Sequence, residues 1–348
     1  MPETMQRIVL AKRPERHPGP ENFRLEEAPV PEPGEGELLV RVIWLSLDPY
    51  MRGRMDEAKS YATPVPVGGT MEGGCVGQVV ASRNPKFAPG DYVTHRFGWC
   101  THAVSDGQGV RRLDPAAAPL STALGVLGMP GLTAYAGLHE HGRPKAGETL
   151  VVGAATGAVG SVVGQLAKLH GLRAVGVAGG PEKCRFAVEE LGFDACLDHR
   201  AAADAAALRD ALAAACPDGV DIYYENVGAK TLEAVIPLMN RFGRIPVCGM
   251  IGWYDLGGMG LGEAPGPNLL PRVWRTILVN RLAVRGFIVT DHADRFRDFI
   301  AEVGAHVREG RLKYREHVTE GIENAPAAFL GMLEGRNFGK TLVKVAEA

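Results

Sequence analysis

The stretch Val151–Lys168, VVGAATGAVGSVVGQLAK, decides the fold that this sequence predicts. It begins inside an apolar run, residues 149–152, which is typical of a buried parallel strand. From Ala158 to Leu169, apolar residues recur at helical spacing. A strand, a tight turn of small residues and a helix together form the phosphate-binding start of a dinucleotide-binding unit.

Two glycines in this turn have separate tasks. Gly157 lets the backbone approach a pyrophosphate, and Gly160 lets the helix pack closely on the strand. The first N–H groups of the helix lack intrahelical partners, and its positive end favours an anion. The position of the first glycine of the GxGxxG pattern is taken by Ala155, or by Gly153 two residues earlier. The pattern alone is a weak signal, but two further strand-like segments, Arg173–Ala178 and Val220–Tyr224, strengthen the prediction.

Length and composition narrow the class of protein. A chain of 348 residues exceeds the size that one hydrophobic core usually supports, so we expect two domains. The formal net charge of -2 gives no electrostatic footprint for nucleic acid or for an anionic membrane. The first five residues lack the apolar core of a signal peptide, and no apolar stretch is long enough to span a bilayer, which favours a cytoplasmic protein. The six cysteines include no CxxC pair, so we expect neither a zinc knuckle nor a redox disulfide.

The chain changes character near residue 115. Before this point, short β-patterned segments alternate with glycine and proline turns. From residue 148 to about 289, strands alternate with helices, which predicts a doubly wound parallel sheet covered on both faces, with its last strand at Leu282–Val289. Thr341–Val345 is typical of a closing strand. We therefore expect an α/β protein with a β-rich domain of residues 1–125, joined by residues 296–348, and a Rossmann domain of residues 126–295.

The end of the second Rossmann strand indicates which dinucleotide binds. At Ala178–Gly180, where an NAD site normally places an acid for the ribose 2′-hydroxyl, the chain turns through Gly-Gly-Pro, and Lys183 and Arg185 follow. A cation there suits the 2′-phosphate of NADP, although a lysine at this position also fits a solvated surface. The carboxyl ends of the later strands should line the same crevice near the nicotinamide: Tyr224–Gly228, Cys248–Met250 with Tyr254, and Phe287–Val289.

A second motif makes a family resemblance specific. Asp48–Arg52, Asp-Pro-Tyr-Met-Arg, and the glycine turn occur in the order and at the spacing of a known family. Further matching segments are Gly69–Met71, Gly176–Cys184, Leu191–Ala195, Tyr224–Gly228, Cys248–Gly249 with Tyr254, Gly286–Val289 and Asn337–Lys340. On these residues the chain resembles, over almost its entire length, the zinc-free medium-chain dehydrogenase/reductases of the leukotriene B4 12-hydroxydehydrogenase, prostaglandin reductase and curcumin reductase branch. The resemblance implies a GroES-like β-rich catalytic domain and a homodimer.

The resemblance also implies an activity and a set of site residues. The activity is the NADPH-dependent reduction of the carbon–carbon double bond of α,β-unsaturated ketones and aldehydes. By position, Gly157, Ala158, Val159 and Gly160 hold the pyrophosphate, and Lys183 meets the 2′-phosphate. The residues around the ribose and the nicotinamide are Asn226, Cys248, Gly249, Tyr254, Phe287, Ile288, Val289 and Asn337. His199 stands where many relatives have a tyrosine near the 2′-phosphate; an imidazole can still bind a phosphate, and it makes the affinity sensitive to pH.

The reduction that the resemblance implies requires a hydrogen-bond donor to the substrate oxygen. When hydride passes from C4 of the nicotinamide to the β-carbon, negative charge develops on the substrate oxygen and must be stabilised. Tyr254 is the first candidate donor, and Tyr50 is the second. Either tyrosine could instead line a pocket or pack in a turn, and a ribose hydroxyl of the cofactor could donate in place of Tyr254. We expect Arg52 to pair with an acid, and water to protonate the α-carbon.

Catalytic zinc is not expected. Zinc-dependent relatives need a Gly-His-Glu segment and a first cysteine ligand, whereas residues 69–73 read Gly-Thr-Met-Glu-Gly and Leu45–Asp48 contains no cysteine. The remaining candidates, His95, His102, Cys75 and Cys100, fit scattered polar and core residues.

Two alternative functions stay open from the sequence. An NADPH quinone oxidoreductase would share the fold and the cofactor, and a non-catalytic NADPH-binding protein would bind the cofactor without turnover. The loops at Ser60–Val67 and Gly252–Pro271 should shape the substrate pocket.

Overall fold

The computed structural model describes residues 4–256, 262 and 268–348, which form two compact units. The first unit contains the described residues within 1–125, 254–263 and 316–348, and the second unit contains those within 126–253 and 264–315. Residues 296–315, which the sequence analysis assigned to the first domain, therefore belong to the second unit. Residues 254–256 and 262 fall in the first unit although they were expected in the Rossmann domain.

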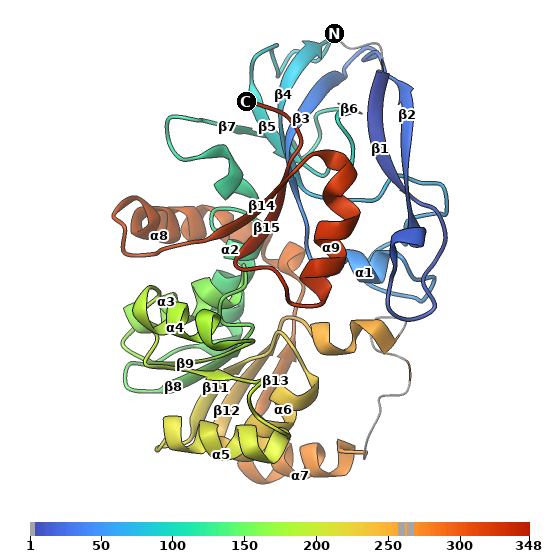
Figure 1. The fold of residues 1–348 in the computed structure, drawn as a ribbon. Helices are drawn as coiled ribbons and strands as arrows, with labels where there is room; N and C mark the ends of the chain where they lie inside the picture. The colour runs from blue at the N-terminus through green and yellow to red at the C-terminus, as the bar shows by residue number, and fades with distance from the viewer. Residues whose placement is uncertain (1–3, 257–261, 263–267) are drawn as a thin grey trace. The chain divides into compact units, whose positions relative to one another are not determined.

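The second unit is built on a parallel sheet whose strand order is β10-β9-β8-β11-β12-β13 (Figure 1). The strands are β8 (Thr149–Gly153), β9 (Arg173–Ala178), β10 (Ala195–Asp198), β11 (Val220–Tyr224), β12 (Met239–Val247) and β13 (Ala283–Gly286). Every ladder in this order is parallel, and the strand order reverses direction between β8 and β11. The predicted doubly wound sheet is confirmed, and ligands of such sheets bind beyond the carboxyl ends of the strands at this reversal.

Helices cover both faces of this sheet. Since successive residues of a strand point to opposite faces, the buried neighbours of the β8 residues show which helices pack on each face. Leu150 and Val152 join one buried cluster with α3 (Gly160–Leu169) and α8 (Phe296–Arg308), whereas Val151 joins the cluster that contains α5 (Ala205–Ala215). The other helical segments are α2 (Met129–Ala136), η3 (Gly137–Gly142), α4 (Pro181–Glu189), α6 (Ala229–Val235), η4 (Ile236–Leu238), η5 (Ile251–Leu256), α7 (Leu270–Asn280) and η6 (Val289–Arg295).

One predicted strand is shorter than expected. The sequence pattern places a strand over Leu282–Val289, but β13 ends at Gly286. Phe287 and Ile288 continue as a connection, and η6 begins at Val289. The segment predicted to lie near the nicotinamide therefore follows the strand end, which is where ligand-contacting residues of a doubly wound sheet are found.

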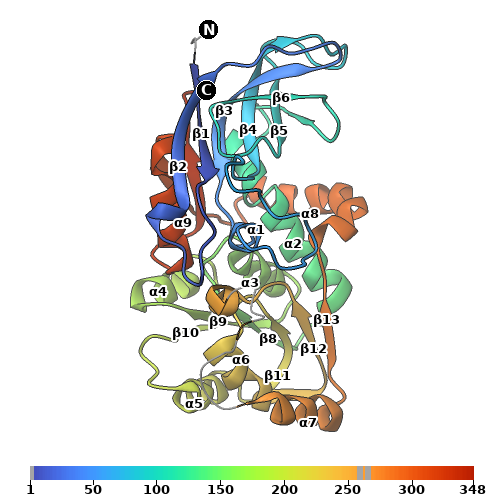
Figure 2. The ribbon, with the colours of Figure 1, turned by 90° about the vertical axis from the view of Figure 1, so that its right-hand side faces the viewer.

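The first unit is a β-rich unit in which strands from both ends of the chain meet (Figure 2). One sheet has the order β14-β15-β3-β4-β5-β7, β6 pairs with β3, and β1 pairs with β2 as a separate ribbon. The strands are β1 (Thr4–Leu10), β2 (Phe23–Pro29), β3 (Leu38–Ser46), β4 (Cys75–Ser82), β5 (Tyr92–His95), β6 (His102–Ser105), β7 (Arg111–Leu113), β14 (Glu316–Glu320) and β15 (Lys340–Lys344). Since β15 pairs antiparallel with β3, the C-terminal segment completes the sheet of the N-terminal segment.

Aromatic side chains fill the core of the first unit. The ring of Trp99 is fully buried and stacks on Phe23, with ring centroids 5.7 Å apart and planes 6° apart. Phe329 of α9 (Ala325–Leu333) meets Trp99 edge-on at 5.6 Å, so α9 packs against the strands through this ring. The remaining helical segments of the unit are η1 (Pro20–Asn22), α1 (Met51–Arg54), η2 (Leu120–Leu124) and η7 (Ile322–Asn324).

The helices of both units are too short or too polar to cross a membrane, as far as the described residues go.

Candidate active site

The turn between β8 and α3 has the geometry that the sequence predicts for a phosphate-binding turn. Ala154 adopts a left-handed conformation with φ of 52°, and α3 begins at Gly160. A Cβ atom on Gly160 would lie 2.3 Å from the carbonyl oxygen of Ala154, and one on Gly157 would lie 3.1 Å from the same oxygen. Gly160 is therefore required by the close approach of helix and strand, whereas the space at Gly157 is less tight.

The N-terminus of α3 can hold an anion. Ala158, Val159 and Gly160 lie at the open end of the helix, where the first N–H groups have no carbonyl partner one turn earlier. The carbonyl of Gly157 already accepts the N–H of Ser161 at 3.1 Å, and the carbonyl of Val159 accepts the N–H of Val163 at 3.0 Å, so the helical hydrogen bonding starts at Gly157. Aligned peptide dipoles add positive potential at the same end, which suits a diphosphate.

Basic side chains gather at the ends of β9 and β10. A Cβ atom on Gly179 would lie 2.9 Å from Nε2 of His199 and 3.0 Å from Nε of Arg200, so both side chains lie against the end of β9. Lys183 is the third residue of α4, whose first turn follows the same strand end. Burial lowers the pKa of Lys183, and the charge of Arg200 lowers it further. The structure therefore places two predicted residues, Lys183 and His199, with Arg200, which the sequence analysis did not select.

An acid and a lysine shape this basic cluster. Asp198 accepts hydrogen bonds from the N–H groups of Gly180 (2.8 Å) and Arg200 (2.9 Å). Burial opposes ionisation of Asp198, but these backbone donors outweigh it and lower the pKa of its carboxyl group. Lys230 donates to the carbonyl of His199 at 2.6 Å. Burial lowers the pKa of His199, and the nearby charge of Lys230 adds to this effect, so the imidazole is neutral at pH 7.

Glu225 joins the ends of β11 and β12; the sequence analysis placed its segment, Tyr224–Gly228, near the nicotinamide but did not select Glu225 itself. Its carboxylate is buried and accepts from the Tyr223 hydroxyl (2.9 Å) and from the N–H groups of Val227 (2.6 Å) and Gly228 (2.8 Å). The backbone carbonyl of Glu225 accepts from the two predicted residues that follow β12, Cys248 at 2.9 Å and Gly249 at 3.1 Å. Burial raises the pKa of Glu225, while the backbone donors oppose that rise. An acid directly after a buried strand was the available signal.

Two more predicted residues lie at this edge of the sheet. Asn226 donates through its side-chain amide to the carbonyl of Gly153 at 3.0 Å, which ties the end of β11 to the start of the phosphate-binding turn. The ring of Phe287 meets that of Tyr224 edge-on at 6.4 Å. Ile288 and Val289 follow Phe287 into η6. The second unit thus brings together the predicted residues from the turn, β11, β12 and the segment after β13.

Tyr50 caps the short helix α1 in the first unit. Burial raises the pKa of its phenol, and the nearby carboxylates of Asp48 and Glu72 raise it further, so Tyr50 is a neutral donor at physiological pH. The guanidinium carbon of Arg54 lies 5.4 Å from the Tyr50 ring centroid and 4.5 Å from that of Tyr61. Arg54 also donates to Glu72 at 2.6 Å, which fixes the guanidinium between the two rings and the acid.

Arg52 pairs with an acid, as the sequence analysis expected. Its side chain is fully buried, and it donates to Asp56 at 2.7 Å and to the carbonyl of Arg16 at 2.6 Å. Its Nε atom lies 4.0 Å from Asp255, and Asp255 lies 2.7 Å from Nδ1 of His17. Arg52 therefore fixes the loop around α1 and lies within ionic range of the residue next to Tyr254.

The second tyrosine, Tyr254, belongs to η5 and is 7% exposed. The contacts of Asp255 with His17 and Arg52 fix the backbone beside it. Asn337 donates to the carbonyl of Gly339 at 2.9 Å within the turn that precedes β15. Half of the predicted pocket loop Gly252–Pro271 lies outside the described residues, since these omit 257–261 and 263–267.

The cysteines weighed as metal ligands are core residues. Cys75 donates to the carbonyl of Gly98 at 3.2 Å, and Cys100 donates to that of Phe97 at 3.2 Å. Burial raises the pKa of Cys100 to about 12, so its thiol stays protonated at neutral pH.

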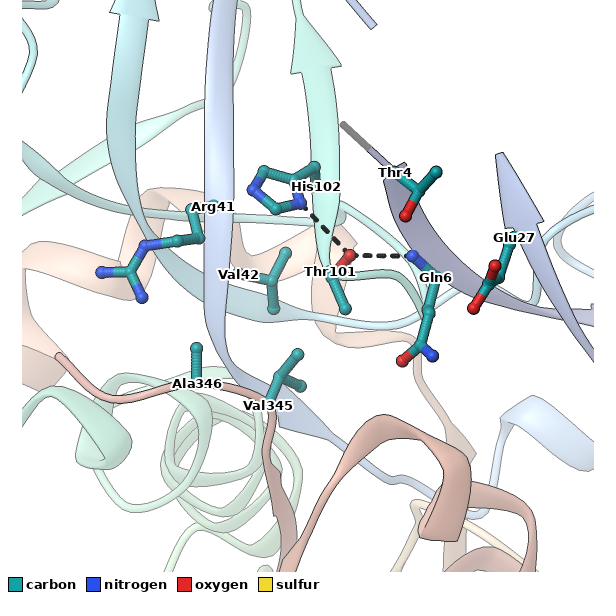
Figure 3. Close-up of a pocket in the computed structure, with 9 residues that line it drawn as sticks. All are labelled: Thr4, Gln6, Glu27, Arg41, Val42, Thr101, His102, Val345 and Ala346. Carbon is teal, nitrogen blue, oxygen red and sulfur yellow. Dashed lines mark hydrogen bonds between the residues drawn. The ribbon is translucent and has the colours of Figure 1, made fainter. Parts of the chain in front are cut away.

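A pocket of about 290 Å³ in the first unit contains none of the predicted site residues (Figure 3). It lies beside β1, β3 and β6 and is lined by Thr4, Gln6, Glu27, Arg41, Val42, Thr101, His102, Val345 and Ala346. Thr101 accepts from the N–H of Gln6 at 3.0 Å, and its hydroxyl lies 3.2 Å from Nδ1 of His102. These polar groups serve one another and do not form an acid–base pair aimed into the pocket.

A buried ion pair holds the segment that contains Tyr50. Lys340 donates to Asp48 and to the carbonyl of Leu47, both at 2.7 Å, and Ser46 donates to the other carboxylate oxygen of Asp48. Burial lowers the pKa of Lys340, and the Asp48 carboxylate opposes this effect. The cation from the start of β15 therefore holds the Asp-Pro-Tyr-Met-Arg segment on the end of β3.

Comparison with known proteins gives consistent matches. Residues 6–113 match the family described as the N-terminal domain of oxidoreductase, and residues 158–305 match the family described as zinc-binding dehydrogenase. The NADPH-dependent curcumin reductase of Escherichia coli (strain K12) is 52% identical over 342 residues, which are 98% of this chain and 97% of that protein. Prostaglandin reductase 1 of Rattus norvegicus is 43% identical over 340 residues, which are 97% of this chain and 98% of that protein. The crystal structure of CurA from Vibrio vulnificus in complex with NADPH matches with a TM-score of 0.93 and 48% identity, over 99% of this chain and 100% of that chain.

The doubly wound sheet with its anion-binding turn, and the β-rich unit in the same chain, define a medium-chain dehydrogenase/reductase. Within that superfamily, the chain belongs to the branch that contains curcumin reductase and prostaglandin reductase, which confirms the resemblance seen in the motifs.

Replacing Lys340 tests the buried ion pair. Lys340→Met would leave the Asp48 carboxylate buried without its cation, and we expect the free energy of unfolding to fall by about 3–5 kcal/mol. Urea unfolding followed by circular dichroism measures this change. The double variant Lys340→Met with Asp48→Asn should recover part of the loss, because no charge is then left unpaired.

Lys344→Met is the matched control, since Lys344 lies in the same strand and pairs with Glu347 at the surface. It should change the stability little. Equal losses for both lysines would show that the buried pair has no special role.

Proposed function

We propose that this protein uses NADPH to reduce the carbon–carbon double bond of α,β-unsaturated ketones and aldehydes. The observation that carries the proposal is the pairing of an anion-binding turn after β8 with a basic cluster of Lys183, His199 and Arg200 at the ends of β9 and β10. The turn suits the pyrophosphate and the cluster suits a 2′-phosphate, so the two together favour NADPH over NADH. The names of the curcumin and prostaglandin reductases support an activated double bond as substrate.

The residues around the turn would hold the cofactor. Ala158, Val159 and Gly160 would donate N–H groups to the pyrophosphate, and the basic cluster would neutralise the 2′-phosphate. The N–H of Gly157 donates to the carbonyl of Ala154 at 2.8 Å, so Gly157 would contribute by letting the backbone approach the pyrophosphate. Asn226, Cys248, Gly249, Phe287, Ile288, Val289 and Asn337 are proposed to surround the ribose and the nicotinamide. When bound, NADPH supplies the hydride to the β-carbon of the substrate, and its ribose hydroxyl offers one donor for the substrate oxygen.

The chain's own donor to the substrate oxygen is assigned to Tyr254. A neutral phenol in a mostly buried position stabilises an enolate more strongly than water does, because it is already oriented and lies in a region of low dielectric. Tyr50 is the second donor, since its raised pKa keeps the phenol protonated. Water protonates the α-carbon, and catalytic zinc has no part in this proposal.

The decisive assay follows NADPH oxidation with a simple aliphatic enone in enzyme pretreated with a chelator, with identification of the product. We expect the saturated ketone, formed at an undiminished rate. Tyr254→Phe should lower kcat about 10- to 100-fold with little change in the KM for the enone, because the lost hydrogen bond acts mainly in the transition state. Tyr92→Phe, a half-buried tyrosine of β5, is the matched control and should leave kcat unchanged.

Three results would contradict parts of this proposal. A simple quinone that is reduced with a higher kcat/KM than the enone would favour the quinone oxidoreductase alternative. Tight NADPH binding without oxidation by any conjugated acceptor would favour a non-catalytic binding protein. Native kcat in Tyr254→Phe would remove this residue from the chemistry.

Cofactor discrimination tests the basic cluster. Lys183→Ala and Arg200→Ala each remove a cation beside the proposed 2′-phosphate, so the ratio of kcat/KM for NADPH to that for NADH should fall about 10- to 100-fold. The value for NADH should change little. Arg185→Ala is the control, because Arg185 belongs to the same helix α4 and is exposed. Equal losses with both cofactors would instead indicate a structural role for these residues.

A second copy of this chain is the proposed partner of α7 and β13. Trp274 and Leu278 of α7 are 66% and 76% exposed, and Val284 of β13 is 45% exposed. The strand β13 ends the sheet order, so its outer backbone groups are available for pairing with another strand. These features, with the resemblance to a homodimeric family, support a homodimer.

The molar mass in solution, measured by light scattering, tests this interface. Trp274→Glu with Leu278→Lys should convert the dimer to a monomer, because charges would then enter an apolar interface. Leu25→Lys changes another exposed leucine, located on β2, and should leave the dimer intact. A native chain that runs as a monomer would contradict the proposal directly.

A further inference from the structure

Two histidines and a glutamate from three separate elements meet in the second unit. His139 belongs to η3, His170 follows the last residue of α3, and Glu302 belongs to α8. One ligand atom from each of the three lies within 4.8 Å of the others. Among the described residues, these three form the group of His, Cys, Asp or Glu side chains whose ligand atoms lie close enough together to hold one metal ion.

Two of the distances within the group are close to the edge of a zinc coordination tetrahedron. Nε2 of His139 lies 3.7 Å from Oε1 of Glu302, and Nε2 of His170 lies 3.5 Å from the same oxygen. Zinc bonds of 2.0–2.2 Å in tetrahedral geometry separate neighbouring ligand atoms by roughly 3.3–3.6 Å. The centroids of the two imidazole rings are 4.9 Å apart, and the ring planes are nearly perpendicular, at 81°.

The Nε2 atom of each imidazole has no well-formed hydrogen bond. Nε2 of His139 and Nε2 of His170 are buried, and neither forms a hydrogen bond within the described residues. The contact between His170 and Glu302 is a long hydrogen bond at most, although it lowers the pKa of Glu302, and the separation of His139 from Glu302 exceeds the usual range. Buried polar atoms without partners are uncommon and costly, and a cation between the three side chains would satisfy both nitrogens and the carboxylate.

The charges around the group are compatible with a cation. Arg295 is the nearby basic residue, but it pairs with Glu140 at 3.0 Å and with Asp298 at 3.2 Å. The ring of Tyr135 lies 4.3 Å from that of His139 and holds the imidazole in place. His306, one turn after Glu302 on α8, adds a further imidazole to the surroundings of the carboxylate.

We propose that His139, His170 and Glu302 bind a divalent zinc ion that cross-links η3, the C-terminal end of α3 and α8. Two imidazoles and one carboxylate, with water in the fourth position, form a ligand set that zinc accepts. The ion lies away from the proposed chemistry, because α3 has ten residues and its N-terminus forms the phosphate-binding turn, about 15 Å along the helix axis. Its role is to stabilise the packing of α8 and α3 in the second unit.

Zinc titration of the full, untagged chain tests this site. After removal of metal with a chelator and buffer exchange at pH 7.5, we expect one zinc ion per chain by isothermal titration calorimetry and a rise in Tm of about 5 °C at saturation. His170→Ala and Glu302→Gln should each weaken zinc binding at least tenfold and abolish the rise in Tm. Neither variant nor chelator should change the rate of enone reduction or the affinity for NADPH, so the result is independent of the proposed activity.

Three controls separate this site from other zinc ligands of the chain. His317→Ala removes an exposed histidine of the first unit and should leave zinc binding unchanged. His141→Ala breaks a second histidine pair, in which Nε2 of His141 lies 3.3 Å from Nε2 of His292, and Cys184→Ser removes a thiol beside Cys196. Loss of zinc binding in either of these variants, with full binding in His170→Ala and Glu302→Gln, would overturn the proposal. Absence of zinc binding in the native chain would overturn it as well.

Discussion

The buried ion pair between Lys340 and Asp48 is the constraint on which the first unit depends. Both charged groups are removed from water, which costs free energy unless each has its partner and further hydrogen bonds. Ser46 and the carbonyl of Leu47 supply those bonds. Because the two residues are 292 positions apart, the pair forms only when β15 has joined the sheet beside β3. The position of Tyr50, two residues after Asp48, is therefore set by the last strand of the chain.

The second unit relies on a comparable arrangement, in which one buried carboxylate organises the ends of the strands. Glu225 satisfies two backbone N–H groups after β11, and its carbonyl accepts from Cys248 and Gly249 after β12. Asn226 adds the link to Gly153 at the end of β8. In both units, then, buried polar groups position the loops that carry the candidate site, while the apolar clusters hold the strands and helices beneath them. This division is expected, since a loop at a strand end has few apolar contacts of its own.

The electrostatics of each unit suit the group proposed for it, an anionic cofactor in the second unit and a neutral donor in the first. Positive potential comes from the N-terminus of α3 and from Lys183 and Arg200 around the end of β9. Tyr50 is kept protonated by burial, so it donates a hydrogen bond without adding a charge. An oxygen that becomes negative during reduction is stabilised by such donors.

The sequence by itself determined the strand, turn and helix around Val151–Lys168, the doubly wound order and the pairing of Arg52 with an acid. The first and the last of these depend on residues within a few positions of one another, where periodicity and small-residue turns carry the information. The doubly wound order follows from the alternation of strands and helices along the chain together with right-handed crossovers. Two boundaries differ from those that the sequence pattern predicts: β13 ends at Gly286, and the chain returns to the first unit after residue 315. Tertiary packing decides where an apolar run stops being a strand. Only the tertiary structure brought Arg200 beside His199 at the end of β9, Lys340 onto Asp48, and Glu302 between His139 and His170. Each of these groupings joins residues from separate elements, and its energy comes from burial and charge, which no local sequence pattern encodes.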